Sequence, residues 1–331
     1  MNVAVIGAGA FGRNHARVYH ELSLQDPSIK LAAIVDSDSE LAQALAQKYG
    51  AAAYSSLKAL LHREKIHAAS VAVPTIYHLE VAQLLMEAGI DVLIEKPLAT
   101  SLDEADQLVS VARKTGRIGQ VGHLERFNPA VRATLPLITH PMFFEVHRLS
   151  VFTPRSLDVD VVLDLMIHDL DVILAFVNSP VKEIRAVGLP ILSGKVDIAN
   201  VRMEFDSGCV ANLTASRVST ERVRKLRFFQ PAQYISIDYS RQDVIVFSVG
   251  GAAGPSATPS VNPQISMAKP SVTAEEPLHA ELKCFLDCVR LRTKPLVSLD
   301  DGRRALSIAL EIVSAIQNHS REFQLERLRF S

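Results

Sequence analysis

The chain has 331 residues, which is more than one ordinary hydrophobic core holds, so two domains are expected. Hydrophobic residues make up 48% and charged residues 21% of the sequence, as in a soluble globular protein, and the formal net charge is −1. This balance gives no electrostatic reason to expect nucleic acid or an anionic membrane as a partner.

Targeting and metal-binding patterns are also missing from the sequence. It contains no run of about 18 uncharged apolar residues and no basic N-terminal segment, so we expect neither a membrane span nor a secretory signal, but a cytoplasmic protein. Of the three cysteines, Cys284 and Cys288 lie four residues apart without further Cys or spaced His nearby. We therefore predict no metal site and place the cysteines in the core.

The first 120 residues alternate short apolar runs with helical patterns. Helices are predicted over 78–89 and 101–116, the second opened by a capping box of Ser101 and Glu104 and closed by a glycine. Short apolar runs between helices are typical of a parallel sheet that is covered on both faces. We predict a doubly wound, Rossmann-type α/β domain over residues 1–122. Its strands are expected at 2–7, 31–36, 68–73, 91–95 and 117–122.

The pattern changes after residue 122 to longer, alternating runs, which predict an α+β domain over 123–331 with an open, mainly antiparallel sheet. One helix is expected at 161–173, and two more, at 279–291 and 302–317, could pack back on the first domain. The Gly/Ser/Pro-rich segment 250–271 is predicted to be a mobile loop, either an insertion or a lid. The strands are expected at 142–151, 181–189, 196–205, 209–217, 226–230, 233–239 and 243–249.

A dinucleotide site is predicted after the first strand. Gly7, Gly9 and Gly12 have G-x-G-x-x-G spacing, enclose Ala10 and Phe11, and open a helix. The glycines allow a tight turn and a close approach of backbone N–H groups to a pyrophosphate. Asp36 ends the second strand, where a carboxylate accepts hydrogen bonds from a ribose and repels a 2′-phosphate. The sequence therefore predicts NAD rather than NADP as the cofactor.

The predicted strands 68–73 and 91–95 are also followed by candidate cofactor-binding residues. We expect these residues near the cofactor, because ligands of such sheets lie beyond the carboxyl ends of the strands. Lys96 could stabilise the alkoxide of a substrate, or it could be an ordinary strand-end lysine that points to water; its spacing alone favours the second interpretation. The predicted cofactor-binding residues at these two ends are Pro74, Thr75, His78, Glu95, Lys96 and Pro97.

The predicted helix 161–173 carries a narrow polar stripe. Asp164, His168 and Asp171 lie within about 60° of one another around its axis. The stripe is either a satisfied polar seam on a buried helix or one wall of an active site. A histidine there would suit a general base by its intrinsic pKa.

Together these residues resemble the Gfo/Idh/MocA oxidoreductase family over essentially the whole chain. The glycine turn, the "EKP" of residues 95–97, and the Asp-x-x-x-His of Asp164 and His168 carry the resemblance. It implies a Rossmann domain, an open-sheet domain, a homodimer or homotetramer, and catalysis by Lys96, His168 and Asp164. We expect His168 to be the base, Lys96 its electrostatic partner and Asp164 the orienting group, although Lys96 and His168 could exchange roles.

The amino-acid sequences of three segments, 12–19, 121–131 and 152–171, resemble those of the nucleotide-sugar branch of that family. This resemblance implies oxidation of the 3-hydroxyl of a UDP-linked amino sugar, before an aminotransferase installs nitrogen, as in lipid A synthesis. A free polyol or aldose is the alternative substrate, and a non-catalytic NAD-binding sensor is a third interpretation. Four residues are candidate ligands of the nucleotide part, and each arginine could equally form an ordinary ion pair. They are Arg126, Asn128, Arg155 and Arg217.

Overall fold

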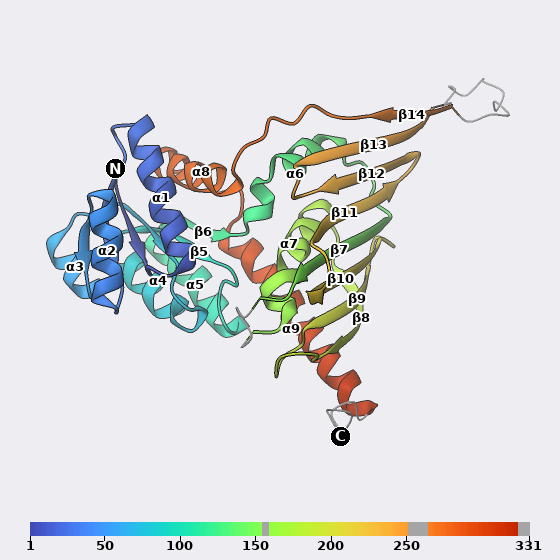
Figure 1. The fold of residues 1–331 in the computed structure, drawn as a ribbon, viewed down its shortest axis with the longest axis horizontal. Helices are drawn as coiled ribbons and strands as arrows, with labels where there is room; N and C mark the ends of the chain where they lie inside the picture. Colours follow the sequence, from blue (N-terminus) through green and yellow to red (C-terminus); the bar gives the residue numbers. More distant parts are fainter. Residues whose placement is uncertain (154–158, 251–263, 324–331) are drawn as a thin grey trace. The chain divides into compact units, whose positions relative to one another are not determined.

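The computed structural model describes residues 1–153, 159–250 and 264–323 and divides the chain into two compact units (Figure 1). The first domain comprises Met1–Phe127 and Glu276–Leu306, and the second comprises Asn128–Glu275 and the residues from Ser307 onward. The chain thus leaves the first domain at Phe127 and returns to it at Glu276. Arg155 and most of the predicted loop 250–271 lie outside the described residues.

The first domain contains a six-stranded parallel sheet, which confirms the predicted fold class. Its strand order is β3-β2-β1-β4-β5-β6, so the order reverses between β1 and β4, where ligands of doubly wound sheets bind. The short β3 was not predicted, because three residues give no usable periodicity. The strands are β1 (Asn2–Ile6), β2 (Lys30–Val35), β3 (Ala52–Tyr54), β4 (Ala68–Val71), β5 (Asp91–Glu95) and β6 (Gly119–Gly122).

Helices cover both faces of this sheet (Figure 1). The predicted capping box forms, since Ser101 Oγ accepts a hydrogen bond from the Glu104 N–H and Gly116 closes the helix in the left-handed region. Helix α8 packs on α1 within one apolar cluster. The helices are α1 (Ala10–Gln25), α2 (Ser39–Tyr49), α3 (Leu57–Arg63), η1 (Thr75–Tyr77), α4 (His78–Glu87), α5 (Leu102–Thr115), η2 (Leu124–Phe127), α8 (Pro277–Leu291) and the start of α9 (Leu299–Glu322).

The second domain contains an eight-stranded sheet in the order β14-β13-β12-β11-β7-β10-β9-β8, in which all neighbours except β7 and β10 are antiparallel. Strand β14 corrects the prediction of a loop throughout 250–271: residues 264–268 pair with β13 despite the low-complexity surroundings. The strands are β7 (Phe143–Val151), β8 (Val181–Leu189), β9 (Ile198–Phe205), β10 (Val210–Ser219), β11 (Val223–Gln230), β12 (Gln233–Asp238), β13 (Asp243–Gly250) and β14 (Gln264–Ala268).

Helix α7 (Ile167–Phe176) lies against one face of this sheet, where the Phe176 ring contacts Phe144 of β7 and Phe228 of β11. The helix is preceded by one π-helical turn, η4 (Val162–Met166). The other helical segments of this domain are α6 (Pro129–Thr134), η3 (Leu135–Leu137) and the end of α9. Within the described residues, no helix is long and apolar enough to cross a membrane.

The opposite face of the sheet carries a row of aromatic side chains from four neighbouring strands. Ring centroids lie 5.8 Å apart between Phe143 and Phe229, 4.9 Å between Phe229 and Tyr234, and 5.6 Å between Tyr234 and Phe247. We call these four residues the aromatic row. By strand register it continues to Met267 on β14, which is 68% exposed.

Candidate active site

The glycine turn has the geometry of a dinucleotide site, and a side chain at each of its three glycines would have a different consequence. Gly7 has φ +101°, and a Cβ there would lie 2.5 Å from the Ala72 carbonyl oxygen. A Cβ on Gly12 would lie 1.7 Å from the carbonyl oxygen of Gly7, so the helix can only approach the turn without a side chain. Gly9 faces open space and caps α1 without a side-chain hydrogen bond. The first N–H groups of α1 therefore suit a pyrophosphate.

The Asp36 carboxylate lies beside this turn. One oxygen accepts a hydrogen bond from the Ala8 N–H at 2.6 Å, and the other accepts one from the Asp38 N–H at 2.9 Å. A carboxylate offers about four acceptor positions, so two remain for ribose hydroxyls. Asp36 thus fits NAD while it also holds the glycine turn against the end of β2.

The ends of β4 and β5 bring further residues to the same edge. Pro74 is exposed and Thr75 half-buried at the end of β4, and Lys96 and Pro97 are half-buried after β5. Ile76 and Tyr77 were missed by the sequence analysis, although they follow a predicted strand end. They are 66% and 48% exposed and give this edge an apolar surface of the kind that cofactor rings use.

Glu95 is buried at the end of β5, where its Oε1 lies 2.8 Å from Nε2 of the buried His15. Burial by itself would raise the pKa of Glu95, but the hydrogen bond from His15 and the charges of His15 and Lys96 outweigh it and hold the pKa below its usual value. The carboxylate is therefore charged at neutral pH and faces into the protein, which favours a supporting role over direct contact with NAD.

His78, a predicted cofactor ligand, makes its polar contacts within the first domain. It is 1% exposed, and both ring nitrogens face backbone carbonyls: Nε2 lies 3.0 Å from Val73 O, and Nδ1 lies 3.1 Å from Pro97 O. Burial lowers the pKa of His78, which favours the neutral ring. Its polar atoms are thus used inside the first domain.

In the second domain, Asp164 lies in the π-helical turn and His168 in the first turn of α7, both half-buried. Single π-helical turns occur often at functional sites. Asp171 is buried further along the helix, where we expect a structural role.

A buried ion pair that the sequence did not reveal fixes α7 on the sheet. Arg148 of β7 donates from Nε to Asp169 Oδ2 at 2.6 Å and from Nη2 to Oδ1 at 3.0 Å. Its guanidinium also lies over the Tyr239 ring, 5.1 Å from the centroid. Because Asp169 directly follows His168, this pair fixes the backbone next to the candidate base.

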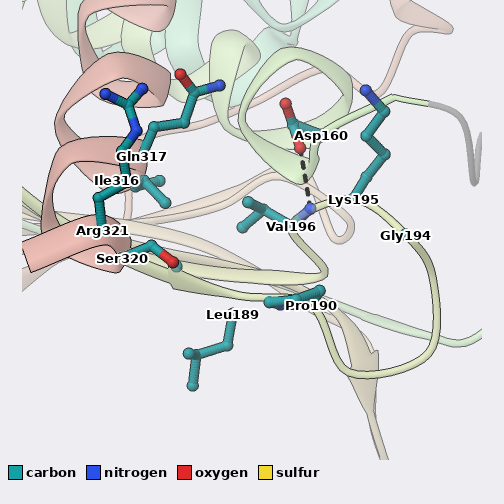
Figure 2. Close-up of a pocket in the computed structure, with 11 residues that line it drawn as sticks. Asp160, Leu189, Pro190, Gly194, Lys195, Val196, Ile316, Gln317, Ser320 and Arg321 are labelled. Carbon is teal, nitrogen blue, oxygen red and sulfur yellow. Dashed lines mark hydrogen bonds between the residues drawn. The ribbon is translucent and has the colours of Figure 1, made fainter. Parts of the chain in front are cut away.

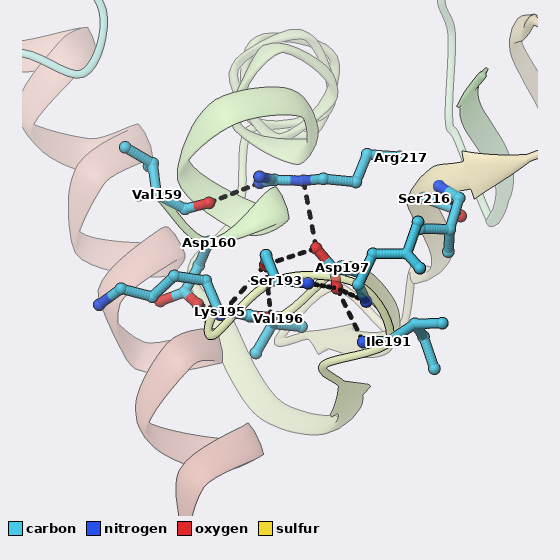
Figure 3. A network of polar contacts seen from close by, with 11 residues as sticks. Val159, Asp160, Ile191, Ser193, Lys195, Val196, Asp197, Ser216 and Arg217 are labelled. Carbon is cyan, nitrogen blue, oxygen red and sulfur yellow. Dashed lines mark hydrogen bonds and ion pairs between the residues drawn. The ribbon is translucent and has the colours of Figure 1, made fainter. Parts of the chain in front are cut away.

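Arg217 contacts its own domain, unlike the nucleotide ligand that we expected. It is 5% exposed; it donates to the Val159 carbonyl oxygen, and its Nε lies 3.8 Å from Asp197 Oδ1 (Figure 3). Asp160 in turn accepts a hydrogen bond from the Val196 N–H at 2.9 Å. These contacts tie the residues just before the π-helical turn to the start of β9.

The buried Asp197 carboxylate organises the loop between β8 and β9. It accepts hydrogen bonds from the N–H groups of Ile191, Leu192 and Ser193 and from the Ser193 hydroxyl, at 2.6–2.8 Å. Burial would raise the pKa of Asp197, but these hydrogen bonds outweigh it and keep the pKa below its usual value. Asp197 is therefore a charged anchor for this loop.

Two other candidate substrate ligands make contacts within their own domains. The Asn128 side chain is 2% exposed, caps α6 by accepting from the Ala130 N–H, and donates to the Tyr239 carbonyl oxygen. Both of these side-chain contacts of Asn128, a predicted substrate ligand, are to the backbone of its own domain. Arg126 is half-buried and donates to the Leu296 carbonyl oxygen at 3.3 Å, so its position leaves the prediction open.

A cavity of about 290 Å³ lies at the loop between β8 and β9 in the second domain (Figure 2). Lys195 lines it from the loop and Arg321 from α9, with Ser320, Gln317 and Asp160 among the other polar residues. The two cations lie on different sides of the lining in Figure 2, so they do not form a single anion clamp.

Both domains of the chain are similar to known proteins. Residues 1–123 match the model of an oxidoreductase family with an NAD-binding Rossmann fold, and residues 113–230 match the GFO/IDH/MocA C-terminal domain. The UDP-N-acetylglucosamine 3-dehydrogenase of Acidithiobacillus ferrooxidans is 34% identical over 318 residues, which are 96% of this chain and 97% of that protein. The chain belongs to the Gfo/Idh/MocA family. It is therefore an NAD-dependent dehydrogenase.

Solved structures agree with this assignment. A structure of the Acidithiobacillus ferrooxidans enzyme superposes with a TM-score of 0.87 at 33% identity, covering 96% of this chain and 98% of that one. The myo-inositol 2-dehydrogenase of Lactobacillus plantarum superposes with a TM-score of 0.79 at 21% identity, covering 96% of this chain and 98% of that one, and supports the fold alone. Among other relatives, the NAD⁺-dependent scyllo-inositol 2-dehydrogenase of Bacillus subtilis is 25% identical, covering 95% of this chain and 94% of that protein.

Proposed function

We propose that this dehydrogenase oxidises the 3-hydroxyl of UDP-N-acetylglucosamine with NAD. The observation that carries the proposal is the 34% identity to an enzyme of that name, which extends over both domains. The catalytic pattern is complete, since Lys96, Asp164 and His168 are all present. Of the four candidate ligands of the nucleotide, we favour the half-buried Arg126, because the described contacts of Asn128 and Arg217 lie inside their own domain.

The chemistry assigns a separate task to each side chain. The glycine turn and Asp36 would hold NAD, which would supply the acceptor for the hydride of the substrate carbon. The hydroxyl proton passes to His168, because histidine is the side chain most often used as a general base. Lys96 stabilises the developing alkoxide by its charge, and Asp164 orients the imidazole or holds the sugar. An exchange of roles between Lys96 and His168 would give the same products.

A free cyclic polyol is the second candidate substrate, because the scyllo-inositol dehydrogenase is also similar over most of its length. The two candidates differ in what must bind the diphosphate. A nucleotide-sugar enzyme uses the binding energy of the UDP part to reach the transition state, and a polyol enzyme does not.

Initial rates of NADH formation distinguish the two candidates. We expect kcat/KM for UDP-N-acetylglucosamine to exceed the values for free N-acetylglucosamine and for myo-inositol by at least about 10²-fold, since the free sugars lack the UDP contacts. UDP-glucose serves as the control for the N-acetyl group. Equal rates with the nucleotide sugar and the free sugar would reject the nucleotide-sugar proposal.

The proposal extends to the surroundings of the reaction. The keto group of a 3-keto sugar can be transaminated, so an aminotransferase is the expected next enzyme, as in the synthesis of lipid A with a diamino sugar. The cytoplasm is the expected location.

We also propose a homodimer or homotetramer in which a second copy covers the aromatic row and the adjoining Met267. Phe229 is 40% and Met267 68% exposed. Sedimentation equilibrium would report this mass, and a monomer would contradict it.

A further inference from the structure

Each of the two sequence neighbours of Lys96, Glu95 and Pro97, is contacted by a buried histidine. His15 of α1 contacts the Glu95 carboxylate on one side of the lysine, and His78 of α4 contacts the Pro97 carbonyl on the other. Both imidazoles are at most 1% exposed. Neither ring reaches solvent, and the proposed reaction uses neither of them.

The contact on the Glu95 side is specific in its geometry. Nε2 of His15 lies 2.8 Å from Glu95 Oε1, whereas Nδ1 of the same ring has no hydrogen-bond partner among the described residues. From the other side β6 closes on the carboxylate, because a Cβ on Gly122 would lie 3.1 Å from it. The one polar contact of this buried ring therefore fixes the Glu95 side chain, and the Glu95 carboxylate also lies 3.3 Å from the N–H of Lys96.

The contact on the other side joins two strand ends. Nδ1 of His78 lies 3.1 Å from Pro97 O and 3.3 Å from Leu98 O, and Nε2 lies 3.0 Å from Val73 O after β4. A neutral imidazole has a single N–H, so the two sides compete for one donor. With the proton on Nδ1, the ring donates to the segment after Lys96, while Nε2 lies beside the end of β4.

We propose that His15 and His78 are positioning residues, which hold the backbone on both sides of Lys96 so that its amino group is presented at the carboxyl end of β5. His15 does so through Nε2 and Glu95, and His78 does so through Nδ1 and Pro97. A shift of about 1 Å in a catalytic group can cost about 10²-fold in rate, so such support has a measurable effect. The inference rests on the proposed role of Lys96.

The two ring nitrogens can be tested separately with amide side chains. A glutamine places its NH₂ near the position of Nε2, and an asparagine places it near that of Nδ1. We expect His15→Gln and His78→Asn to keep kcat within about fivefold of the wild type, and His15→Asn and His78→Gln to lower it by about 10²-fold. KM for NAD should change by less than about threefold in all four variants, because both rings are buried and make their polar contacts within the first domain. The exposed His62 of α3, replaced by Asn and by Gln, is the matched control.

The expected pattern is that Gln is tolerated at position 15 and Asn at position 78. A merely structural role of the two histidines would not produce this opposite preference. The same preference for one amide at both positions, or a loss of rate that follows the loss of thermal stability or of NAD affinity, would overturn the proposal. Crystal structures of the NAD-bound variants test the positioning role of the histidines independently of the catalytic role of Lys96. Lys96 should be displaced in His78→Gln and remain in place in His78→Asn. A displaced Lys96 with an unchanged rate would reject the catalytic role of the lysine and leave the positioning intact.

Discussion

Lys96→Met should lower kcat by about 10³-fold while the dissociation constant for NAD changes by less than about threefold. Methionine keeps the length and apolar stem of the side chain but removes the charge that stabilises the alkoxide. His168→Ala should lower kcat by about 10²–10⁴-fold, the usual contribution of a general base. Stopped-flow measurement of hydride transfer and calorimetric titration with NAD check the two quantities separately.

The double variant decides whether the two residues act on the same hydroxyl. If they do, removing both costs much less than the product of the single effects, because each single change already disables the shared proton transfer. Lys58→Met and His62→Ala, both at exposed positions of α3, are the controls and should leave kcat unchanged. A variant of Lys96 or His168 with the wild-type rate would remove that residue from the mechanism.

The second large effect concerns stability. Asp169→Ala should lower the free energy of unfolding by about 3–5 kcal/mol, because it leaves the buried Arg148 guanidinium without its bidentate carboxylate. The two side chains are 3% and 2% exposed, so water cannot replace the lost contacts. The chain has no tryptophan, so circular dichroism during urea unfolding is the suitable measurement.

An exposed ion pair of the same domain gives the matched control. Lys182 and Glu204 lie 3.1 Å apart with side chains 59% and 38% exposed, and Glu204→Ala should cost less than about 1 kcal/mol. Arg148→Met combined with Asp169→Ala should recover part of the loss, since neither charge of this pair then stays buried without the other. Equal costs for Asp169→Ala and Glu204→Ala would contradict the structural role of the buried pair.

The sequence predicted the first domain well because its signals are local. The parallel strands are apolar runs bounded by helices, and the turn at Gly7, Gly9 and Gly12 combines spacing with its place after a strand. Helices α8 and α9 were also predictable, as was the possibility that they pack back on the first domain, but the division of α9 between the two domains was not. The return of the chain at Glu276 depends on packing between α1 and α8, which no local pattern records.

The candidate site was only partly predictable for the same reason. The types and order of Lys96, Asp164 and His168 could be recognised. The Val159 carbonyl that Arg217 contacts and the Tyr239 carbonyl that Asn128 contacts are distant in sequence, so these contacts could not be predicted. The π-helical turn before α7 shifts the polar stripe from the spacing of an ideal helix. Arg148 and Asp169 lie 21 residues apart on a strand and a helix, so only the fold brings them together.

The central claim is that hydride leaves carbon 3 of a UDP-linked sugar, and a labelled substrate tests it most directly. UDP-N-acetylglucosamine with deuterium at C3 is incubated with the enzyme and NAD, and the NADH is analysed by mass spectrometry. We expect the deuterium in the NADH and a slower hydride-transfer step than with unlabelled substrate. Unlabelled NADH formed from this substrate, or the absence of any NADH, would contradict the proposed function.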